Sequence, residues 1–267
     1  MSLLALPFPN IDPVIFEIGP LAIRWYSLAY IAGLMLGWRY MLHQSEKPPQ
    51  AATREDVDDF LVWATLGVVL GGRLGYVIFY NFSFYLQNPL AALQVWQGGM
   101  SFHGGVLGVV AAGWLFVHKR SIPALRFADM IAGAAPIGLF FGRIANFING
   151  ELFGRVSDVP WAMVFPRGGL SPRHPSQLYE AALEGALLFV VLWALSRNET
   201  VRNRPGIITG VFLAGYALAR ASIEMFRQPD AHLGFLAAGL TMGQWLSLPM
   251  LLGGVYLIIR ARRPAKG

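Results

Sequence analysis

The sequence contains no cysteine. Disulfides, thiolate metal sites and covalent catalysis by a thiol of the protein itself are therefore excluded. If this protein takes part in a reaction that needs a sulfur nucleophile, the thiol has to come from a substrate. Short catalytic motifs are missing as well, because the Walker A, GxSxG and HExxH patterns do not occur.

Charge is also scarce. Only 13% of the residues are charged, 55% are hydrophobic, and the mean hydropathy is +0.49. A soluble domain carries about 25% charged residues, so this composition predicts a membrane protein. The net charge of +6 does not predict nucleic-acid binding, because the basic residues are scattered through short segments and form no continuous stripe.

The sequence contains several long apolar runs. A spanning helix needs about 20 predominantly apolar residues, and about seven such runs are present, with counts of six or eight left open. The third and fourth are short for a full crossing, so we expect one of them to be tilted or deeply buried. The runs are Leu21–Leu42, Phe60–Tyr80, Phe102–Val117, Phe127–Phe141, Gln177–Leu195, Gly206–Phe226 and Thr241–Ile259.

The predicted fold class is all-α, a polytopic membrane protein with a single transmembrane domain over residues 1–267. Residues 1–20 lack Lys and Arg and are interrupted by prolines. They therefore predict an interfacial segment and not a cleaved signal peptide. A small periplasmic insertion is predicted around residues 146–175.

Basic residues indicate the orientation. With seven spans, four clusters of Lys and Arg fall on one side, which the positive-inside rule makes cytoplasmic. The N-terminus is then periplasmic and the C-terminus cytoplasmic. The clusters are Arg39, Lys47 and Arg54; Lys119, Arg120 and Arg126; Arg197, Arg202 and Arg204; and Arg260, Arg262, Arg263 and Lys266. Topology gives no reason for the arginines of the opposite face, which are Arg143, Arg155, Arg167, Arg173 and Arg227.

The densest polar segment follows the fourth run directly, from Gly142 to Arg155. It contains two asparagines, one glutamate, two arginines and three glycines. Glycine lets the backbone approach a ligand, and Asn and Arg offer donors to phosphate or carbonyl oxygens. The segment therefore predicts a polar binding site, unless it is only an interfacial turn whose arginines reach lipid headgroups.

The sixth run carries a second group of polar residues. Tyr216, Arg220, Glu224 and Arg227 follow one another at spacings that place all four on one face of a helix. An ion pair between Glu224 and a neighbouring arginine is the structural interpretation. An excess of arginine over carboxylate favours an anion-binding site instead.

Further polar residues map to the same membrane face. His103 opens the third run between glycines, and a histidine there is either structural or a general base. Tyr26 opens the first run, and Arg73 lies near the end of the second. Glu180 and Glu184, four residues apart, are expected to neutralise arginines on neighbouring helices.

The run GRIANFINGELFG, from Gly142 to Gly154, resembles the signature of the prolipoprotein diacylglyceryl transferase family. Other segments resemble the same family, so the resemblance spans nearly the whole chain. They are Asp12–Phe16, Arg24–Tyr26, Gly71–Tyr76, Ser101–Gly105, His174–Glu180 and Glu224–Asp230.

The resemblance implies an enzyme of the bacterial cytoplasmic (inner) membrane that needs no cofactor or metal. The implied reaction moves the sn-1,2-diacylglyceryl group of phosphatidylglycerol to the lipobox cysteine thiol in the signal peptide of a preprolipoprotein. It is the first step of lipoprotein maturation and releases glycerol 1-phosphate. Membrane lipid and these signal peptides are the implied partners, and nucleic acid is not. An anionic donor lipid fits the arginines, and a substrate thiol fits a chain without cysteine.

The resemblance also implies roles for individual residues. We expect Arg143 and Arg220 to hold the charge of the leaving phosphate and His103 to take the thiol proton. Loss of that proton to water or to the departing phosphate stays open. The residues expected to bind substrate or to hold the arginines in place are Tyr26, Arg143, Asn146, Glu151, Gly154, Tyr216, Glu224 and Arg227.

Two other classes of function fit the residues alone. A transporter or flippase for an anionic lipid or metabolite would also line a membrane cavity with arginines. Inverted repeats, which many transporters have, are not evident in the sequence. An intramembrane hydrolase would use water as the acceptor and release diacylglycerol.

Overall fold

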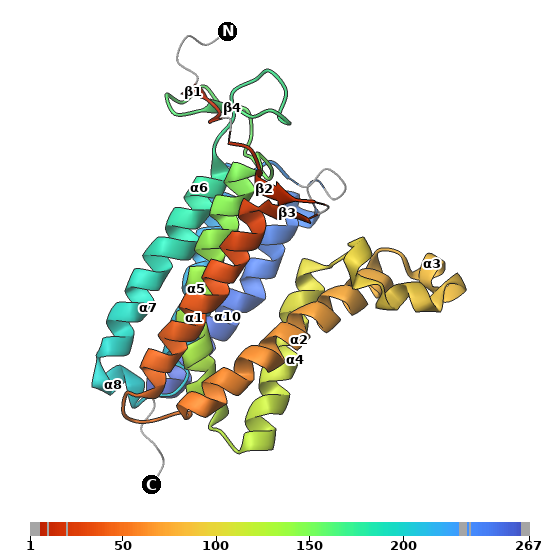
Figure 1. Ribbon diagram of the computed structural model, residues 1–267. Helices are drawn as coiled ribbons and strands as arrows, with labels where there is room; N and C mark the ends of the chain where they lie inside the picture. The colour runs from red at the N-terminus through yellow and green to blue at the C-terminus, as the bar shows by residue number, and fades with distance from the viewer. Residues whose placement is uncertain (1–5, 10, 20, 230–233, 235, 263–267) are drawn as a thin grey trace. The chain divides into compact units, whose positions relative to one another are not determined.

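The computed structural model describes residues 6–9, 11–19, 21–229, 234 and 236–262 (Figure 1). The chain forms two compact units. The first unit contains Met1–Met41 and Ala128–Gly267, and the second contains Leu42–Phe127.

A helix occupies each of the seven predicted apolar runs. These helices are α1 (Trp25–Ser45), α2 (Arg54–Phe79), α4 (Phe102–Arg120), α5 (Ala124–Ile148), the continuous run of α6 (Ser176–Glu180), η3 (Ala181–Leu187) and α7 (Leu188–Arg197), then α9 (Ile207–Ile223) and α10 (Met242–Arg262). Shorter elements are α3 (Phe82–Gln87), η1 (Pro89–Leu93), η2 (Val95–Gln97), α8 (Glu199–Arg202) and η4 (Ala237–Gly239).

By length and apolar composition, four helices within the described ranges can cross a bilayer. They are α2, α5, the run Ser176–Arg197 and α10. The apolar helix α9 is shorter, with 17 residues. The chain is therefore a mostly helical protein with several helices of membrane-spanning type.

The third and fourth runs were predicted too short. α4 has 19 residues, and α5 has 25 and continues past Phe141 to Ile148. Arg143 and Asn146 of the polar segment therefore lie on a helix. A hydropathy pattern marks the end of a run at its first polar residues. The helix itself can continue past that point, because its backbone hydrogen bonds persist where the polar side chains find partners.

Two small sheets add to the predicted all-α fold. β2 (Val14–Ile18) pairs antiparallel with β3 (Leu21–Arg24). Because β3 occupies the predicted start of the first span, α1 begins at Trp25 and not at Leu21.

The second sheet ties the N-terminal segment to a distant part of the chain. β1 (Leu6–Pro7) pairs parallel with β4 (Met163–Val164). Beside this pairing, the Phe8 ring packs on the rings of Phe147 and Phe165, with centroid distances of 5.4 and 5.2 Å. The N-terminal segment thus packs on the loop region that follows α5.

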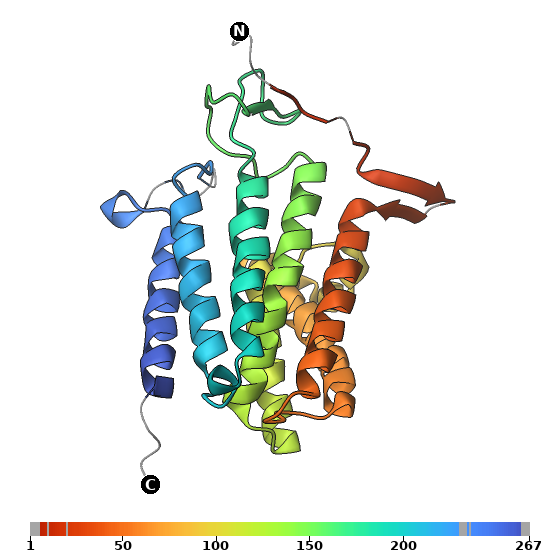
Figure 2. The same cartoon turned by 90° about the vertical axis from the view of Figure 1, so that its left-hand side faces the viewer.

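Five helical runs of the first unit lie side by side in the order α10, α9, α6–α7, α5 and α1 (Figure 2). Small residues permit close contacts between them. A Cβ on Gly33 would lie 3.1 Å from the Cα of Gly138, and one on Gly185 would lie 2.7 Å from the Cβ of Phe140. α1, α6 and α10 begin, and α5 and α9 end, at the end of the unit where the strands also lie, which is the upper end in Figure 2. We call this the site end.

In the second unit, α2 and α4 cross at a stripe of glycines. A Cβ on Gly108 would lie 2.0 Å from the carbonyl oxygen of Gly67, and one on Gly104 would lie 2.4 Å from that of Gly71. Such small residues let two backbones approach closely, which is a usual basis for helix association in membranes.

Arg73 organises the surface segment that follows α2. Its buried guanidinium donates hydrogen bonds to five backbone carbonyls, and its Cζ lies 5.3 Å from the centroid of the Tyr85 ring. One cation therefore holds an otherwise uncharged segment, residues 82–99, in place. The carbonyls belong to Ala91, Ala92, Gln94, Gly98 and Gly99.

Candidate active site

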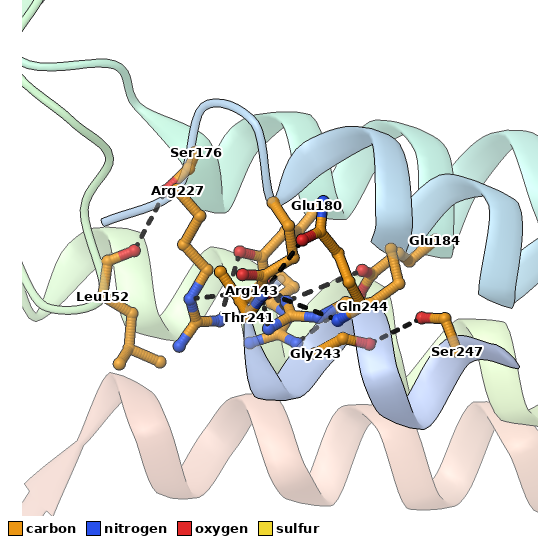
Figure 3. Close-up of polar contacts among 12 residues, drawn as sticks. Arg143, Leu152, Ser176, Glu180, Glu184, Arg227, Thr241, Gly243, Gln244 and Ser247 are labelled. Atoms are coloured by element: carbon orange, nitrogen blue, oxygen red, sulfur yellow. Dashed lines mark hydrogen bonds and ion pairs between the residues drawn. The ribbon is translucent and has the colours of Figure 1, made fainter. Parts of the chain in front are cut away.

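Three arginines and three glutamates meet at the site end of the first unit (Figure 3). We call them the arginine–glutamate cluster. All six side chains are largely or fully buried. The members are Arg143 of α5, Glu180 and Glu184 of the α6–α7 run, Arg220 of α9, and Glu224 and Arg227 just beyond α9.

Glu180 contacts all three arginines. Its Oε2 lies 2.6 Å from Nε of Arg143 and 3.6 Å from Nη1 of Arg220. Its Oε1 lies 3.5 Å from Nη1 of Arg227. The exposed fraction of the Glu180 side chain is 1%. A charge buried to this degree is tolerated only among opposite charges, so this carboxylate and the three guanidinium groups fix one another.

Glu184 and Glu224 complete the pairing. Oε2 of Glu184 lies 3.5 Å from Nη2 of Arg143, and its Oε1 lies 3.9 Å from Nη1 of Arg220. Glu224 pairs with Arg220 one helical turn earlier, and its Oε1 lies 3.9 Å from Nε of Arg227. These contacts confirm that Arg220, Glu224 and Arg227 lie together, but α9 ends at Ile223, so Glu224 and Arg227 lie just beyond the helix and not on its face as predicted. They also confirm that Glu184 neutralises arginines of neighbouring helices.

The expected excess of arginine over carboxylate does not hold inside the cluster, where three arginines face three glutamates. A guanidinium has five N–H donors, and a carboxylate has two oxygens with about four lone-pair sites. Nη1 of Arg220 is buried and makes only ion-pair contacts with Glu180 and Glu184, and these two carboxylates also keep buried oxygens without a hydrogen-bond partner among the described residues. The cluster is electrically balanced, and both its guanidinium donors and its carboxylate acceptors keep unused hydrogen-bonding capacity.

The α6–α7 run presents its polar side chains on one face. Gln177, Glu180 and Glu184 are buried and follow one another at helical spacing. Glu184 lies within η3, a segment with π-helical hydrogen bonds. Such wide turns inside α-helices are frequent at functional sites. Gln177, one turn before Glu180, extends this polar face toward the loop.

The polar segment after α5 turns back toward α6. Asn146 and Asn149 donate hydrogen bonds to Oε1 of Glu151 at 2.9 and 3.2 Å. Nε2 of Gln177 donates to the carbonyl oxygen of Glu151 at 2.6 Å. The structure thus brings Asn146 and Glu151 together and fixes them against the start of α6.

Gly154 lies where two chain segments meet. It forms an antiparallel bridge with Arg227, and a Cβ at Gly154 would lie 2.6 Å from the carbonyl oxygen of Phe226. A larger residue would have to displace backbone there. The next residue, Arg155, donates hydrogen bonds to the carbonyl oxygens of Arg227 and Glu224 at 2.9 and 3.1 Å. The end of the polar segment is therefore tied to the chain just beyond α9.

A small cleft with a volume of about 20 Å³ lies beside the cluster. Thr241 and Gln244 cap the start of α10 with reciprocal hydrogen bonds at 3.0 and 3.3 Å. A Cβ on Gly243 would lie 2.7 Å from Oε1 of Glu224 and 3.1 Å from Nε of Arg220, so glycine lets α10 approach this pair. The cleft is lined by Arg220, Glu224, Arg227, Gly234, Thr241, Met242 and Gly243.

Tyr26 lies in the first turn of α1, at the site end. The contact of Gly33 with Gly138 sets a register between the antiparallel helices α1 and α5 that brings Tyr26 level with Ala145. The hydroxyl of Tyr26 lies 3.3 Å from that of Tyr30. Tyr26 is therefore at the level of the polar segment, as the sequence predicts.

Two predicted site residues have other described contacts. Tyr216 packs against an apolar core that includes Leu192, and its ring stacks on Phe212 at 6.1 Å. His103 lies in the first turn of α4, in the second unit, and its ring contacts Phe102 at 5.7 Å. Their roles in substrate binding and proton transfer stay predictions. Within the described ranges, no group of three or more His, Asp or Glu residues is arranged to hold a metal ion.

His174 ends a chain of hydrogen bonds before α6. Nε1 of Trp161 donates to the Tyr179 hydroxyl at 2.6 Å, and this hydroxyl lies 3.1 Å from Nδ1 of His174. Because an indole only donates, the tyrosine oxygen accepts from it, and the tyrosine hydrogen is left for Nδ1. Burial lowers the pKa of His174, which favours the neutral ring that this arrangement needs.

Known proteins resemble this chain over nearly its whole length. The model of the family described as prolipoprotein diacylglyceryl transferase matches residues 13–260. Relatives named phosphatidylglycerol–prolipoprotein diacylglyceryl transferase are 63% identical in Azospirillum brasilense and 64% identical in Paramagnetospirillum magneticum, each over 98% of this chain and 98% of the relative. A relative of the same name from Rhodospirillum rubrum is 60% identical over 98% of this chain and 96% of the relative. The chain therefore belongs to the prolipoprotein diacylglyceryl transferase family.

Proposed function

We propose that this protein transfers the diacylglyceryl group of phosphatidylglycerol to a cysteine thiol of a prolipoprotein, and that the arginine–glutamate cluster holds the phosphate of the donor lipid. The observation that carries the proposal is the burial of three guanidinium groups beside a cleft. Arg220 and Arg227 line that cleft, and Arg143 is joined to them through Glu180.

The reaction breaks a carbon–oxygen bond. The substrate thiolate attacks the glyceryl carbon that carries the phosphate, a thioether forms, and the bonding electron pair leaves with the phosphate oxygen as glycerol 1-phosphate. The phosphate of the diester carries one negative charge, and the departing monoester gains a second. Arginine donors held in place therefore stabilise the transition state more than the bound lipid, which is the condition for catalysis.

The glutamates supply the positioning in this proposal. Free guanidinium groups in a membrane cavity would repel one another, whereas Glu180, Glu184 and Glu224 hold them close together before substrate binds. Because the cluster is balanced without substrate, the anionic phosphate binds through guanidinium N–H donors and not through a net positive charge. Four residues are proposed to orient the headgroup or the arginines: Asn146, Glu151, Gly154 and Tyr26. Tyr216 is proposed to support these residues.

The thiol has to lose its proton. A free thiol has a pKa of about 8.5, so a base with a pKa of about 6.5 helps to form the thiolate at neutral pH. We assign this role to His103. Water or the departing phosphate are the alternatives.

We also propose seven crossings of the bacterial inner membrane, with a periplasmic N-terminus and a cytoplasmic C-terminus. α1, α4 and α9 would join the four helices that already have the length and composition of spans. The site end would then face the periplasm, where a translocated signal peptide presents its lipobox cysteine. Because the chain has no cysteine, single cysteines test this orientation. A membrane-impermeant thiol reagent should label Leu170→Cys in intact spheroplasts and leave Thr200→Cys unlabelled, and the reverse pattern would refute it.

A transfer assay tests the function. Purified protein is incubated with labelled phosphatidylglycerol and a peptide that carries one lipobox cysteine, and the mass of the peptide is measured. A gain of one diacylglyceryl unit supports the proposal. Lipid movement with unmodified peptide would indicate a transporter, and release of diacylglycerol without peptide would indicate a hydrolase.

Variants separate the roles. Arg143→Ala and Arg220→Ala should each lower turnover by roughly 10²-fold or more. His103→Gln should lose activity at neutral pH and regain it above about pH 8.5, where the thiol ionises by itself. Arg54→Ala is the control, because its side chain is 62% exposed and its ion pair with Glu46 contributes little. Near-normal turnover of correctly folded Arg143→Ala would contradict the proposal that Arg143 stabilises the leaving phosphate.

A further inference from the structure

Leu152 has a backbone conformation that leucine rarely adopts. Its φ is 57°, in the left-handed region. Gly150, two residues earlier, has a φ of 64°. Glycine reaches this region without steric cost, whereas the Cβ of leucine approaches the following carbonyl oxygen there. Leu152 is therefore strained at a position where glycine or asparagine would adopt the same backbone conformation with little steric cost.

The backbone around Leu152 is held from α6. Oγ of Ser176 donates a hydrogen bond to the Leu152 carbonyl oxygen at 3.1 Å (Figure 3), and Gln177 holds the preceding carbonyl at 2.6 Å. These contacts explain the conformation of the main chain. They do not explain the side chain, since a glycine would make the same hydrogen bonds.

Packing explains the side chain only in part. The exposed fraction of Leu152 is 40%, so a large part of its side chain is available for contact with a substrate. Figure 3 shows it at the Arg227 end of the arginine–glutamate cluster, where its side chain extends away from the loop. Strained residues of this kind are concentrated at ligand sites. An apolar group beside buried guanidinium groups is suited to a substrate that is polar at one point and apolar next to it.

We propose that Leu152 determines acceptor specificity by contacting the apolar side chains that flank the cysteine of the peptide substrate. This inference rests on the proposed transfer reaction. Leu152 lies in the loop between the end of α5 at Ile148 and the start of α6 at Ser176, beyond the ends of these helices. In the proposed reaction, the acyl chains of the donor lipid lie along the membrane-spanning helices, away from this loop. A peptide whose cysteine meets the cluster therefore places its neighbouring apolar residues at this level.

The test compares Leu152→Gly, Leu152→Met and Leu170→Ala by steady-state transfer kinetics and thermal unfolding. Leu152→Gly removes the side chain and the strain together, so its melting temperature should equal or exceed that of the parent. Its KM for the peptide should rise about tenfold, while its KM for phosphatidylglycerol stays unchanged. Leu152→Met should keep the parental KM for the peptide. Leu170 is the matched control, because it is 91% exposed in the same loop region.

A second peptide identifies the contact. In this peptide, alanines replace the apolar residues next to the cysteine. The parent should lose about tenfold in kcat/KM on this peptide, and Leu152→Gly should lose little, because the partner side chain is already gone. Equal losses in the two proteins would overturn the proposal, as would a rise in the KM for phosphatidylglycerol alone. The parent protein tests the transfer reaction independently of Leu152. If the parent lipidates neither peptide, the transfer function is refuted, whereas the proposed contact of Leu152 is not.

Discussion

Nε of Arg143 lies 2.6 Å from Oε2 of Glu180, which joins the end of α5 to the start of the α6–α7 run. The same carboxylate also reaches Arg220 and Arg227. One glutamate therefore connects three helical segments that are far apart in the sequence. The positions of the three guanidinium groups depend on it more than on any one arginine.

Glu180→Gln tests this dependence. Glutamine keeps the shape of the side chain and removes its charge, so three buried guanidinium groups lose a common partner. We expect a loss of about 3 kcal/mol of stability and a drop in transfer of roughly 10²-fold. Thermal unfolding and the peptide lipidation assay measure the two effects. Glu199→Gln on α8 is the control, since Glu199 is exposed. Parental stability and turnover in Glu180→Gln would contradict the central role of this carboxylate.

Gly243→Ala tests how closely α10 has to approach the cluster. The added methyl group would lie 2.7 Å from Oε1 of Glu224, so the Arg220–Glu224 pair has to shift. Because catalytic groups displaced by about 1 Å can cost 10²-fold in rate, we expect transfer to fall by tenfold or more while the fold persists. Gly253→Ala on the same helix has no neighbour within 4 Å and should keep parental activity. Equal activity of the two variants would show that the approach of α10 is unimportant.

The helices and much of the site were predictable because local rules govern them. Hydropathy located the seven helical runs, and helical spacing predicted that Arg220, Glu224 and Arg227 lie together, although α9 ends at Ile223. The same spacing indicated that Glu180 and Glu184 face arginines of other helices, which the ion pairs confirm.

Partner choice between distant segments was not predictable. Arg73 and Arg143 each follow a glycine near the end of an apolar run, yet Arg73 binds backbone carbonyls and Arg143 binds carboxylates. An arginine is long enough to reach several kinds of acceptor, so the fold decides which one it meets. The strained conformation of Leu152 and the pairing of β1 with β4 likewise depend on contacts that short-range patterns do not encode.

His174 predicts a pH dependence of stability. Burial lowers the pKa of His174 below its ordinary value of about 6.5, so the unfolded chain binds a proton more readily than the folded protein. This contribution to stability is therefore complete above about pH 6.5 and is lost as the pH falls below it. Melting temperatures at pH 8 and pH 5.5 should differ more for the parent than for His174→Gln. The exposed His118 provides the control, and His118→Gln should keep the parental difference. An unchanged difference in His174→Gln would remove His174 as the cause.

Gly108→Ala tests the glycine crossing of the second unit. Both Gly108 and Gly105 lie inside α4, so alanine improves helix propensity equally at the two positions. A Cβ at Gly108 would lie 2.0 Å from the carbonyl oxygen of Gly67, whereas at Gly105 the nearest atom is 3.7 Å away. The difference between the two variants therefore isolates the contact of α4 with α2. We expect Gly108→Ala to lose about 1–3 kcal/mol relative to Gly105→Ala, measured by thermal unfolding in detergent micelles. If the two variants melt together, the close approach of these helices does not contribute to stability, and Gly108 needs another explanation.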